Sequence, residues 1–200
     1  MIKIGKRILI VCEDEKSSKI YFESFKRDEK LKRKLASVDI QVVHPKDNSP
    51  VGLVEAAKLL KKKAKRQRNS YDKIYIVLDR DRHANMDKAM NTAKDNKMEF
   101  MLSVICFESW ILLHFEKTTK VFSKCDKVIS YIKNNHFKEY QKNKNSYEFL
   151  KGKTNTAIKN GKWCIKQNKN DINRGKKIHL LSAYTNIHEL VTKLLNPDLF

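Results

Sequence analysis

The feature that most constrains the fold is a strand-length apolar run that ends abruptly in acidic residues, at 73–83 (Lys-Ile-Tyr-Ile-Val-Leu-Asp-Arg-Asp-Arg-His). Asp79 and Asp81 follow the apolar run, and cationic side chains stand between and after them. In an open α/β sheet, groups at the carboxyl ends of strands lie in the crevice where ligands bind. Two carboxylates this close repel each other unless a cation compensates them, and hard oxygen ligands suit Mg²⁺ or Mn²⁺. The alternative interpretation is a solvated turn that closes a strand.

The same pattern occurs near the N-terminus, where the apolar run at 7–12 leads directly into Glu13-Asp14-Glu15. If the two runs form neighbouring parallel strands, Glu13 and the Asp79/Asp81 pair converge on one spot. Carboxylates supplied by separate strands can hold a metal that activates water or binds a phosphate. Glu108 follows a further strand-like run and is a third candidate ligand. Its alternative role is a helix N-terminal charge that complements the helix dipole.

The order of the apolar patterns predicts an α/β fold. Strands are expected at 7–12, 38–44, 73–79 and 99–106, and helices between them at 16–35, 51–68 and 86–96. This alternation is typical of a parallel four-stranded sheet with right-handed crossovers and helices on both faces. Ser17 and Ser18 are expected to cap the first helix, whose N–H groups lie next to Glu13 and could bind a phosphate.

The composition changes beyond residue 118. Residues 120–176 are rich in Lys and Asn and lack strand-like runs, and Thr185 or Asn186 is expected to cap a C-terminal helix. We therefore expect two parts: an α/β domain at 1–118 that carries the site, and a basic helical region at 119–200 that packs back on it.

The chain carries 43 Lys and Arg residues against 23 Asp and Glu residues, a formal net charge of +20. A surplus of this size favours a polyanionic partner, with nucleic acid (RNA or DNA) as the leading candidate. The densest basic tract lies on the predicted helix 51–68 and lacks the interleaved Glu of an ion-paired helix. The alternative for this tract is an ordinary solvated helix face without a nucleic-acid contact. The alternative for Asn186 is a structural role as a helix cap. The residues expected to contact nucleic acid are Lys16, Lys61, Lys62, Lys65, Arg66, Arg68, Arg82, Asn186 and His188.

The four cysteines are scattered, without a Cys-x-x-Cys motif or the His/Cys spacing of a zinc site. Cys12 and Cys106 end apolar runs and are expected to be small buried hydrophobic residues. No signal peptide and no membrane-length apolar span is visible in the sequence. A cytoplasmic protein with reduced thiols is therefore expected.

Four segments, in this order, resemble the RloB-like family. They are Ile10-Val11-Cys12-Glu13, Val77-Leu78-Asp79-Arg80-Asp81, Cys106-Phe107-Glu108-Ser109-Trp110 and Thr185-Asn186-Ile187-His188-Glu189. The family looks like a branch of the Toprim (Rossmann-like) fold, in which a strand-end Glu and a strand-end Asp-x-Asp form a divalent-metal site. Its members are found in anti-phage loci, often beside an ATPase partner of the AAA or ABC type (RloA-like). A related Toprim effector of another phage-defence system cleaves tRNA.

The resemblance implies a nuclease that depends on Mg²⁺ or Mn²⁺ and cleaves RNA, with tRNA as a candidate, or DNA, in anti-phage defence or abortive infection. Its catalytic candidates are Glu13, Asp79, Asp81, Glu108 and His83, of which the four acids are the expected metal ligands and Glu13 is alternatively the general acid/base. Lys16, Arg82 and His83 are expected to contact phosphate, and Asn186 and His188 to line the same crevice.

Two alternatives to an active nuclease stay open. One is a non-catalytic, metal-dependent subunit that binds nucleic acid or nucleotide and regulates an ATPase partner. The other is a nuclease that is silent until a partner or a phage trigger releases it. Two departures from the family pattern border the site: Asp14 replaces a glycine that allows positive φ, and Val104-Ile105 replaces Asn-Pro, which predicts plain strand. Either departure could alter metal number or reduce activity.

Overall fold

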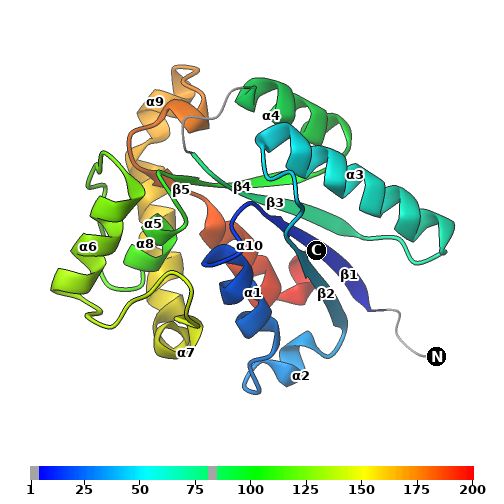
Figure 1. The fold of residues 1–200 in the computed structure, drawn as a ribbon, viewed down its shortest axis with the longest axis horizontal. Helices are drawn as coiled ribbons and strands as arrows, with labels where there is room; N and C mark the ends of the chain where they lie inside the picture. The colour runs from blue at the N-terminus through cyan, green and yellow to red at the C-terminus, as the bar shows by residue number, and fades with distance from the viewer. Residues whose placement is uncertain (1–4, 81–84) are drawn as a thin grey trace.

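The computed structural model describes residues 5–80 and 85–200, which form an α/β fold around a central sheet (Figure 1). Within these residues the sheet has five strands in the order β2-β1-β3-β4-β5. Strands β1 to β4 run parallel, and β5 pairs antiparallel with β4. The strand bounds are β1 Lys6–Cys12, β2 Val38–Val43, β3 Lys73–Asp79, β4 Glu99–Val104 and β5 Tyr184–Thr185.

Helices cover both faces of the sheet. The bounds are α1 Ser18–Lys26, α2 Lys32–Leu35, α3 Pro50–Arg66, α4 Met86–Asp95, α5 Glu108–Leu112, α6 Cys125–Asn135, α7 Tyr147–Leu150, α8 Thr154–Gln167, α9 Lys169–Asn173 and α10 Ile187–Leu195, with 3₁₀ turns η1 Lys151–Lys153, η2 Ile178–Leu180 and η3 Pro197–Leu199. Helices α3 and α4 lie on one face, and α1, α2 and α10 lie on the other (Figure 1). None of these helices, in the ranges described, has the length and apolar character needed to cross a membrane.

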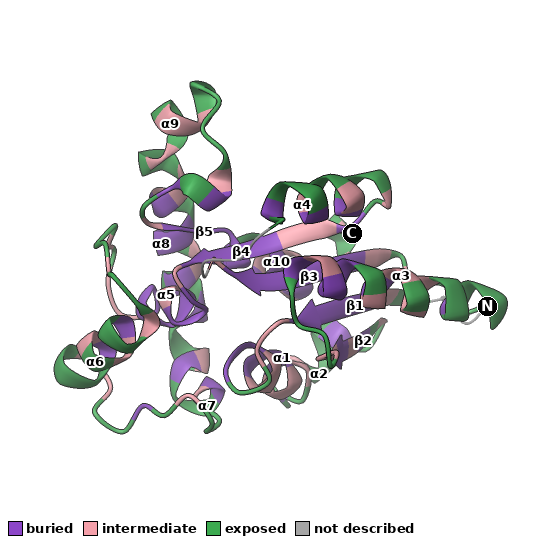
Figure 2. Ribbon diagram, turned by 45° about the horizontal axis from the view of Figure 1, so that its top comes forward, coloured by how far each residue is buried: buried purple, intermediate pink, exposed green. Residues whose placement is uncertain are grey.

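Alternate side chains of the strands fill two cores, one on each face of the sheet. In β1, Ile8 and Ile10 belong to the core with α1, whereas Leu9 and Val11 belong to the core with α3. All four side chains are fully buried. A strand that is covered on both faces has apolar residues at nearly every position. For this reason the apolar runs in the sequence predict the positions of β1 and β3 closely. Figure 2 shows this burial concentrated on the strands and on the inward sides of the helices.

The helix predicted at 16–35 is divided into α1 and α2, because Asp28 interrupts it. Asp28 Oδ1 accepts a hydrogen bond from Lys30 N at 2.9 Å, a local bond that competes with helical pairing. Its Oδ2 accepts a hydrogen bond from Tyr147 Oη of α7 at 2.8 Å. Tyr147 is 119 positions away from Asp28 in the sequence, so the periodicity of residues 16–35 could not predict this contact.

The C-terminal region joins the sheet, which corrects the prediction of a four-stranded, fully parallel sheet. After β5, Asn186 continues the pairing with its side chain: its Oδ1 accepts from Leu102 N at 2.7 Å, and its Nδ2 donates to Phe100 O at 3.0 Å. The core that contains Ile8 also contains Val128, so residues on both sides of position 118 share it. The division into 1–118 and 119–200 stays a prediction.

Strand β4 is shorter than predicted, because it ends at Val104 and does not continue to Cys106. The peptide bond between Val104 and Ile105 is cis. Of the two residues that replace Asn-Pro, Val104 is in the strand, as predicted, and Ile105 is not.

Candidate functional site

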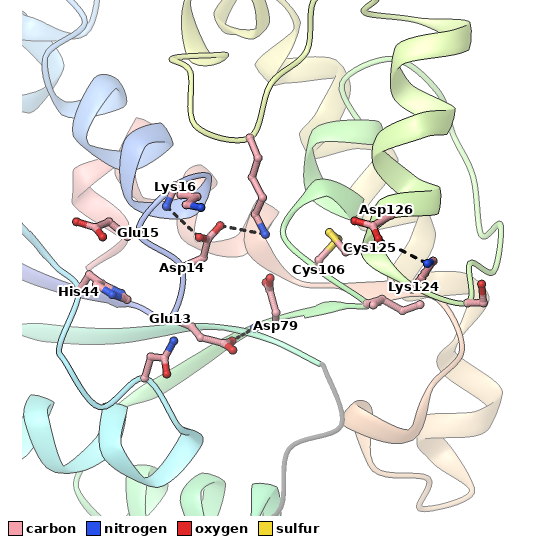
Figure 3. A pocket seen from close by; sticks show the side chains of 14 residues that line it. Glu13, Asp14, Glu15, Lys16, His44, Asp79, Cys106, Lys124, Cys125 and Asp126 are labelled. Atoms are coloured by element: carbon pink, nitrogen blue, oxygen red, sulfur yellow. Dashed lines mark hydrogen bonds and ion pairs between the residues drawn. A yellow bond between two sulfur atoms is a disulfide. The ribbon is translucent and has the colours of Figure 1, made fainter.

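The carboxyl ends of β1 and β3 bring Glu13 and Asp79 together. Cys12 pairs with Val77 in the sheet, and Glu13 N donates to Val77 O at 3.0 Å. The Glu13 side chain reaches the neighbouring strand, where its Oε2 accepts a hydrogen bond from Asp79 N at 2.6 Å. The expected convergence of these two strand-end acids is present (Figure 3). Three other residues predicted for the site lie outside the described ranges: Asp81, Arg82 and His83.

Glu13 and Asp79 line an open cavity of about 740 Å³. Its described lining combines acids from the ends of β1 and β3 with lysines, among them the predicted Lys16. His44, which follows β2, also lines the cavity, and its Nδ1 lies 3.2 Å from Cys12 O. A cavity of this size accommodates a nucleotide-sized ligand.

Ser17 occupies the N-cap position of α1, as predicted, but its side chain makes no capping hydrogen bond. The turn before α1 is instead bonded by Asp14. Its carboxylate accepts hydrogen bonds from Lys16 N and Ser17 N, both at 2.9 Å. Burial opposes ionisation of Asp14, but the bonds from Ser17 and Lys16 and the nearby Lys142 ammonium outweigh burial and lower its pKa. Asp14 has no positive φ, so the replacement of glycine is accommodated without left-handed backbone. The N–H groups of Lys16 and Ser17, just before α1, are therefore occupied by this carboxylate.

Asp79 is a buried carboxyl group, only 9% exposed, at the end of β3. Burial, and then the neighbouring charges of Glu13 and Glu108, raise its pKa well above the ordinary value. The Lys142 ammonium acts in the opposite direction but does not cancel these effects. The site therefore holds a carboxylate whose charge the protein compensates only in part.

Lys142 reaches the site from the connection between α6 and α7, and the sequence analysis missed it. Its Nζ lies 3.4 Å from Asp14 Oδ2 and 3.9 Å from Glu108 Oε2. Burial acts to lower its pKa, but the carboxylates of Glu108, Asp14 and Asp79 prevail and raise it. Lys142 is one of many lysines in a Lys/Asn-rich stretch, and no motif distinguishes it there.

Glu108 lies at the start of α5, as predicted, but it lies behind the described lining of the cavity and is not part of it. Its side chain is fully buried, and its Oε1 accepts a hydrogen bond from Tyr140 Oη at 2.8 Å. Its Oε2 lies 3.2 Å from Cys125 Sγ. Burial raises the pKa of Glu108, although Lys142 and Tyr140 oppose the shift. The role of Glu108 as a Mg²⁺ or Mn²⁺ ligand stays a prediction.

Cys106 and Cys125 form a disulfide at the edge of the cavity, which corrects the expectation of reduced thiols (Figure 3). The residues are 19 positions apart in sequence, on segments that only the tertiary fold brings together. Cys106 is therefore more than the small buried hydrophobic residue predicted. Cys12 fits that description, because it is a free, buried thiol whose pKa burial raises to about 12.

The basic tract of α3 lies at the far end of that helix from the cavity. Asn48, just before α3, lines the cavity, and a rise of about 1.5 Å per residue puts the tract roughly 16 to 25 Å further along. Lys61 Nζ donates to Asn96 O at 2.6 Å, which holds α3 against the end of α4. The other predicted residues of the tract are exposed: Lys62, Lys65, Arg66 and Arg68. Their contact with nucleic acid stays a prediction.

Asn186 and His188 lie inside the protein, 6% and 4% exposed. Asn186 is bonded to the backbone of β4, and the His188 ring packs where α10 meets Gly161 of α8. Burial lowers the pKa of His188 to about 4, so the ring is neutral at neutral pH. Neither residue belongs to the described lining of the cavity.

The chemical type of the strand-end donors suits a hard divalent cation. Glu13 and Asp79 provide carboxylate oxygens, the ligands that Mg²⁺ and Mn²⁺ prefer, whereas the Asp14 carboxylate is bonded to Lys16 N, Ser17 N and Lys142. The raised pKa of Asp79 marks an incompletely compensated charge, which a bound cation would neutralise.

Comparison with known proteins agrees with the resemblance drawn from the motifs. No curated protein and no solved structure matches the chain. The model of the RloB-like protein family matches residues 8–194, which include most of β1, all of β2 to β5, the described lining of the cavity and most of α10. The chain therefore belongs to the RloB-like protein family.

Proposed function

We propose that this protein is a nuclease of Toprim type that hydrolyses phosphodiester bonds of RNA or DNA with Mg²⁺ or Mn²⁺. The observation that carries the proposal is the Glu13–Asp79 contact, in which acids from two neighbouring parallel strands share one cavity. Family membership supports it further, because the resemblance implies a strand-end Glu and Asp-x-Asp as the metal-binding set.

Glu13 and Asp79, together with Asp81 of the Asp-x-Asp motif, would hold the cation. A bound Mg²⁺ or Mn²⁺ would supply charge neutralisation at the scissile phosphate and at the leaving oxygen. The hydrogen bond from Asp79 N fixes the orientation of the Glu13 carboxylate, as a general acid/base or a metal ligand requires. Asp14 holds the turn between β1 and α1 in place through its bonds to the backbone of Lys16 and Ser17.

Lys142 and Lys16 are the described cations best placed to receive a phosphate. Both line the cavity, Lys16 from the turn after β1 (Figure 3) and Lys142 from the connection between α6 and α7. An ammonium group in a partly buried site stabilises negative charge more strongly than one in water. Anti-phage defence, RNA with tRNA as a candidate, and an ATPase partner of RloA-like type are proposed from the family resemblance alone.

The test is cleavage of labelled tRNA, single-stranded DNA and duplex DNA by the full chain in Mg²⁺, Mn²⁺ or EDTA. We expect cleavage only with a metal, and a loss of about 100-fold or more in Asp79→Asn and in Asp81→Asn. The matched control is Asp87→Asn, since Asp87 is an exposed acid of α4 paired with Lys177. This control should cleave like the parent protein.

Cleavage that survives in Asp79→Asn would refute the proposed site. Metal-dependent binding of nucleic acid without cleavage, alone and with the ATPase partner present, would favour the non-catalytic binding subunit. Cleavage that appears only with the partner would favour the silent nuclease.

A further inference from the structure

Cys106, Glu108 and Cys125 form a compact group beside the acids of the cavity. One ligand atom of each residue lies within 4.8 Å of the other two. Three elements hold them, because Cys106 follows β4, Glu108 begins α5 and Cys125 begins α6. The tertiary fold thus brings these three residues together where β4, α5 and α6 meet.

The Glu108 carboxylate is aimed at the sulfur atoms. Tyr140 Oη donates to its Oε1 at 2.8 Å, while its Oε2 lies 3.2 Å from Cys125 Sγ. A disulfide sulfur carries no proton, so this short contact is not a hydrogen bond in the oxidised pair. The Tyr140 bond is of the kind that orients a metal-binding carboxylate from outside the ligand set.

We propose that, in the reduced protein, Cys106, Cys125 and Glu108 bind a thiophilic divalent cation of the zinc class. Thiolates together with a carboxylate favour Zn²⁺, whereas oxygen-only sites favour Mg²⁺ and Mn²⁺. Tetrahedral zinc with sulfur and oxygen ligands about 2.0 to 2.3 Å away places those ligands roughly 3 to 4 Å apart. The observed spread of the three atoms is within reach of that geometry.

The surroundings offset most of the charge of such a site. Two thiolates and one carboxylate carry three negative charges; a divalent cation neutralises two of them, and Lys142, shared with Asp14, lies with its Nζ 3.9 Å from Glu108 Oε2 and 3.4 Å from Asp14 Oδ2. Buried charges are tolerated when they are compensated in this way. Both cysteines line the cavity, so the fourth coordination position would face it and take water or a ligand.

The disulfide of the present structure and the metal site are two states of the same residues. A dithiol reductant delivers two electrons and two protons, the S–S bond breaks, two thiols form, and the reductant becomes a disulfide. Binding of Zn²⁺ then releases the two thiol protons to solvent. The inference does not depend on nuclease activity.

The experiment is zinc binding by the full chain, reduced with a phosphine, desalted without oxygen and titrated with Zn²⁺ against a chromogenic chelator. We expect one Zn²⁺ per chain in the reduced protein and none at this site in the oxidised protein. Cys125→Ser should lower the affinity by about 100-fold or more, and Glu108→Gln by about 10-fold or more. Co²⁺ bound in place of Zn²⁺ should show thiolate-to-metal charge-transfer absorption that Cys125→Ser removes.

Two variants separate this site from the rest of the molecule. Cys164→Ser alters a free, buried cysteine outside the group and should bind Zn²⁺ like the parent protein. Asp79→Asn alters the oxygen-ligand site and should also leave Zn²⁺ binding intact. Circular dichroism establishes that each variant is folded, and Cys125→Ala replaces Cys125→Ser if the latter is not. Absence of Zn²⁺ from the reduced parent protein, or equal affinity in folded Cys125 variants, would overturn the inference.

Discussion

Replacing Asp79 by asparagine should stabilise the metal-free protein at neutral pH, although it removes a site residue. Asp79 is 9% exposed, and burial, Glu13 and Glu108 raise its pKa well above the ordinary value. Ionising a buried carboxyl that is compensated only in part costs several kcal/mol, which Lys142 offsets to some extent. Asparagine has nearly the same shape and no charge. We therefore expect the free energy of unfolding to rise by about 1 to 3 kcal/mol near pH 7.5.

The pH dependence follows from the direction of this shift. Above the pKa of the unfolded chain, about 3.9 for aspartate, the folded state still holds the proton that the unfolded state has lost. The contribution of Asp79 to stability therefore falls as pH rises from that value through the higher folded pKa, and stays low above it. The advantage of Asp79→Asn should be small near pH 4 and largest at neutral pH.

Mg²⁺ should reverse the order of the two proteins if Asp79 is a ligand. A cation that binds only the folded state adds about 2.7 kcal/mol when its concentration is 100 times its Kd. The parent protein should gain this stabilisation and Asp79→Asn should gain little of it. Urea unfolding followed by circular dichroism, at about pH 4 and about pH 7.5, with EDTA or Mg²⁺, measures all of these differences.

The control is Asp87→Asn, which removes an exposed charge and should shift stability by no more than about 0.5 kcal/mol. A metal-free Asp79→Asn protein less stable than its parent at neutral pH would refute the reasoning on uncompensated charge. Equal stabilisation of both proteins by Mg²⁺ would place the cation elsewhere.

Three further substitutions test how the C-terminal region supports the site. Asn186→Ala removes two hydrogen bonds to the backbone of β4 and should lower the free energy of unfolding by about 2 to 4 kcal/mol in urea; a loss below about 0.5 kcal/mol would contradict this role. Gly161→Ala places a Cβ 2.7 Å from the His188 ring and should lower stability by about 1 to 3 kcal/mol in thermal unfolding, whereas Gly152→Ala, in open space, should not. Lys142→Gln should weaken nucleic-acid binding at the cavity in Mg²⁺ by about 10-fold, measured by fluorescence anisotropy, and an unchanged Kd would exclude phosphate contact.

The parts of the site that the sequence predicts are those encoded by neighbouring residues. An apolar run followed at once by an acid places Glu13 and Asp79 at strand ends without knowledge of the fold. Parallel pairing of adjacent strands then brings the two acids together, and the structure has this arrangement. Ser17 is correctly predicted at the N-cap of the first helix, but the side-chain bonds at this turn come from Asp14, whose carboxylate accepts from the N–H groups two and three residues on.

The parts that the sequence does not predict depend on contacts between distant segments. β5 has two residues, too few to give an alternating pattern, and exists because the returning chain pairs with β4. Lys142 is one of many lysines in its stretch, and Cys125 is one of four scattered cysteines. Only the tertiary fold places these two residues beside the site. Asp28, between α1 and α2, likewise accepts a hydrogen bond from Tyr147, which lies 119 positions further along the chain.

The distribution of charge implies that the surface and the cavity act differently on a nucleic acid. The chain has a formal charge of +20. The described lining of the cavity nevertheless has five carboxylates against three lysines, a formal surplus of two negative charges. Under the proposed function, the surface would attract a phosphate backbone while the cavity would repel it until a divalent cation neutralised the carboxylates. Salt dependence of binding in EDTA should report the surface lysines and arginines alone, and the additional binding in Mg²⁺ should report the cavity. Asp79→Asn should change only the additional binding in Mg²⁺ and leave binding in EDTA as it is. A salt titration of both proteins therefore separates the contribution of the surface from that of the cavity.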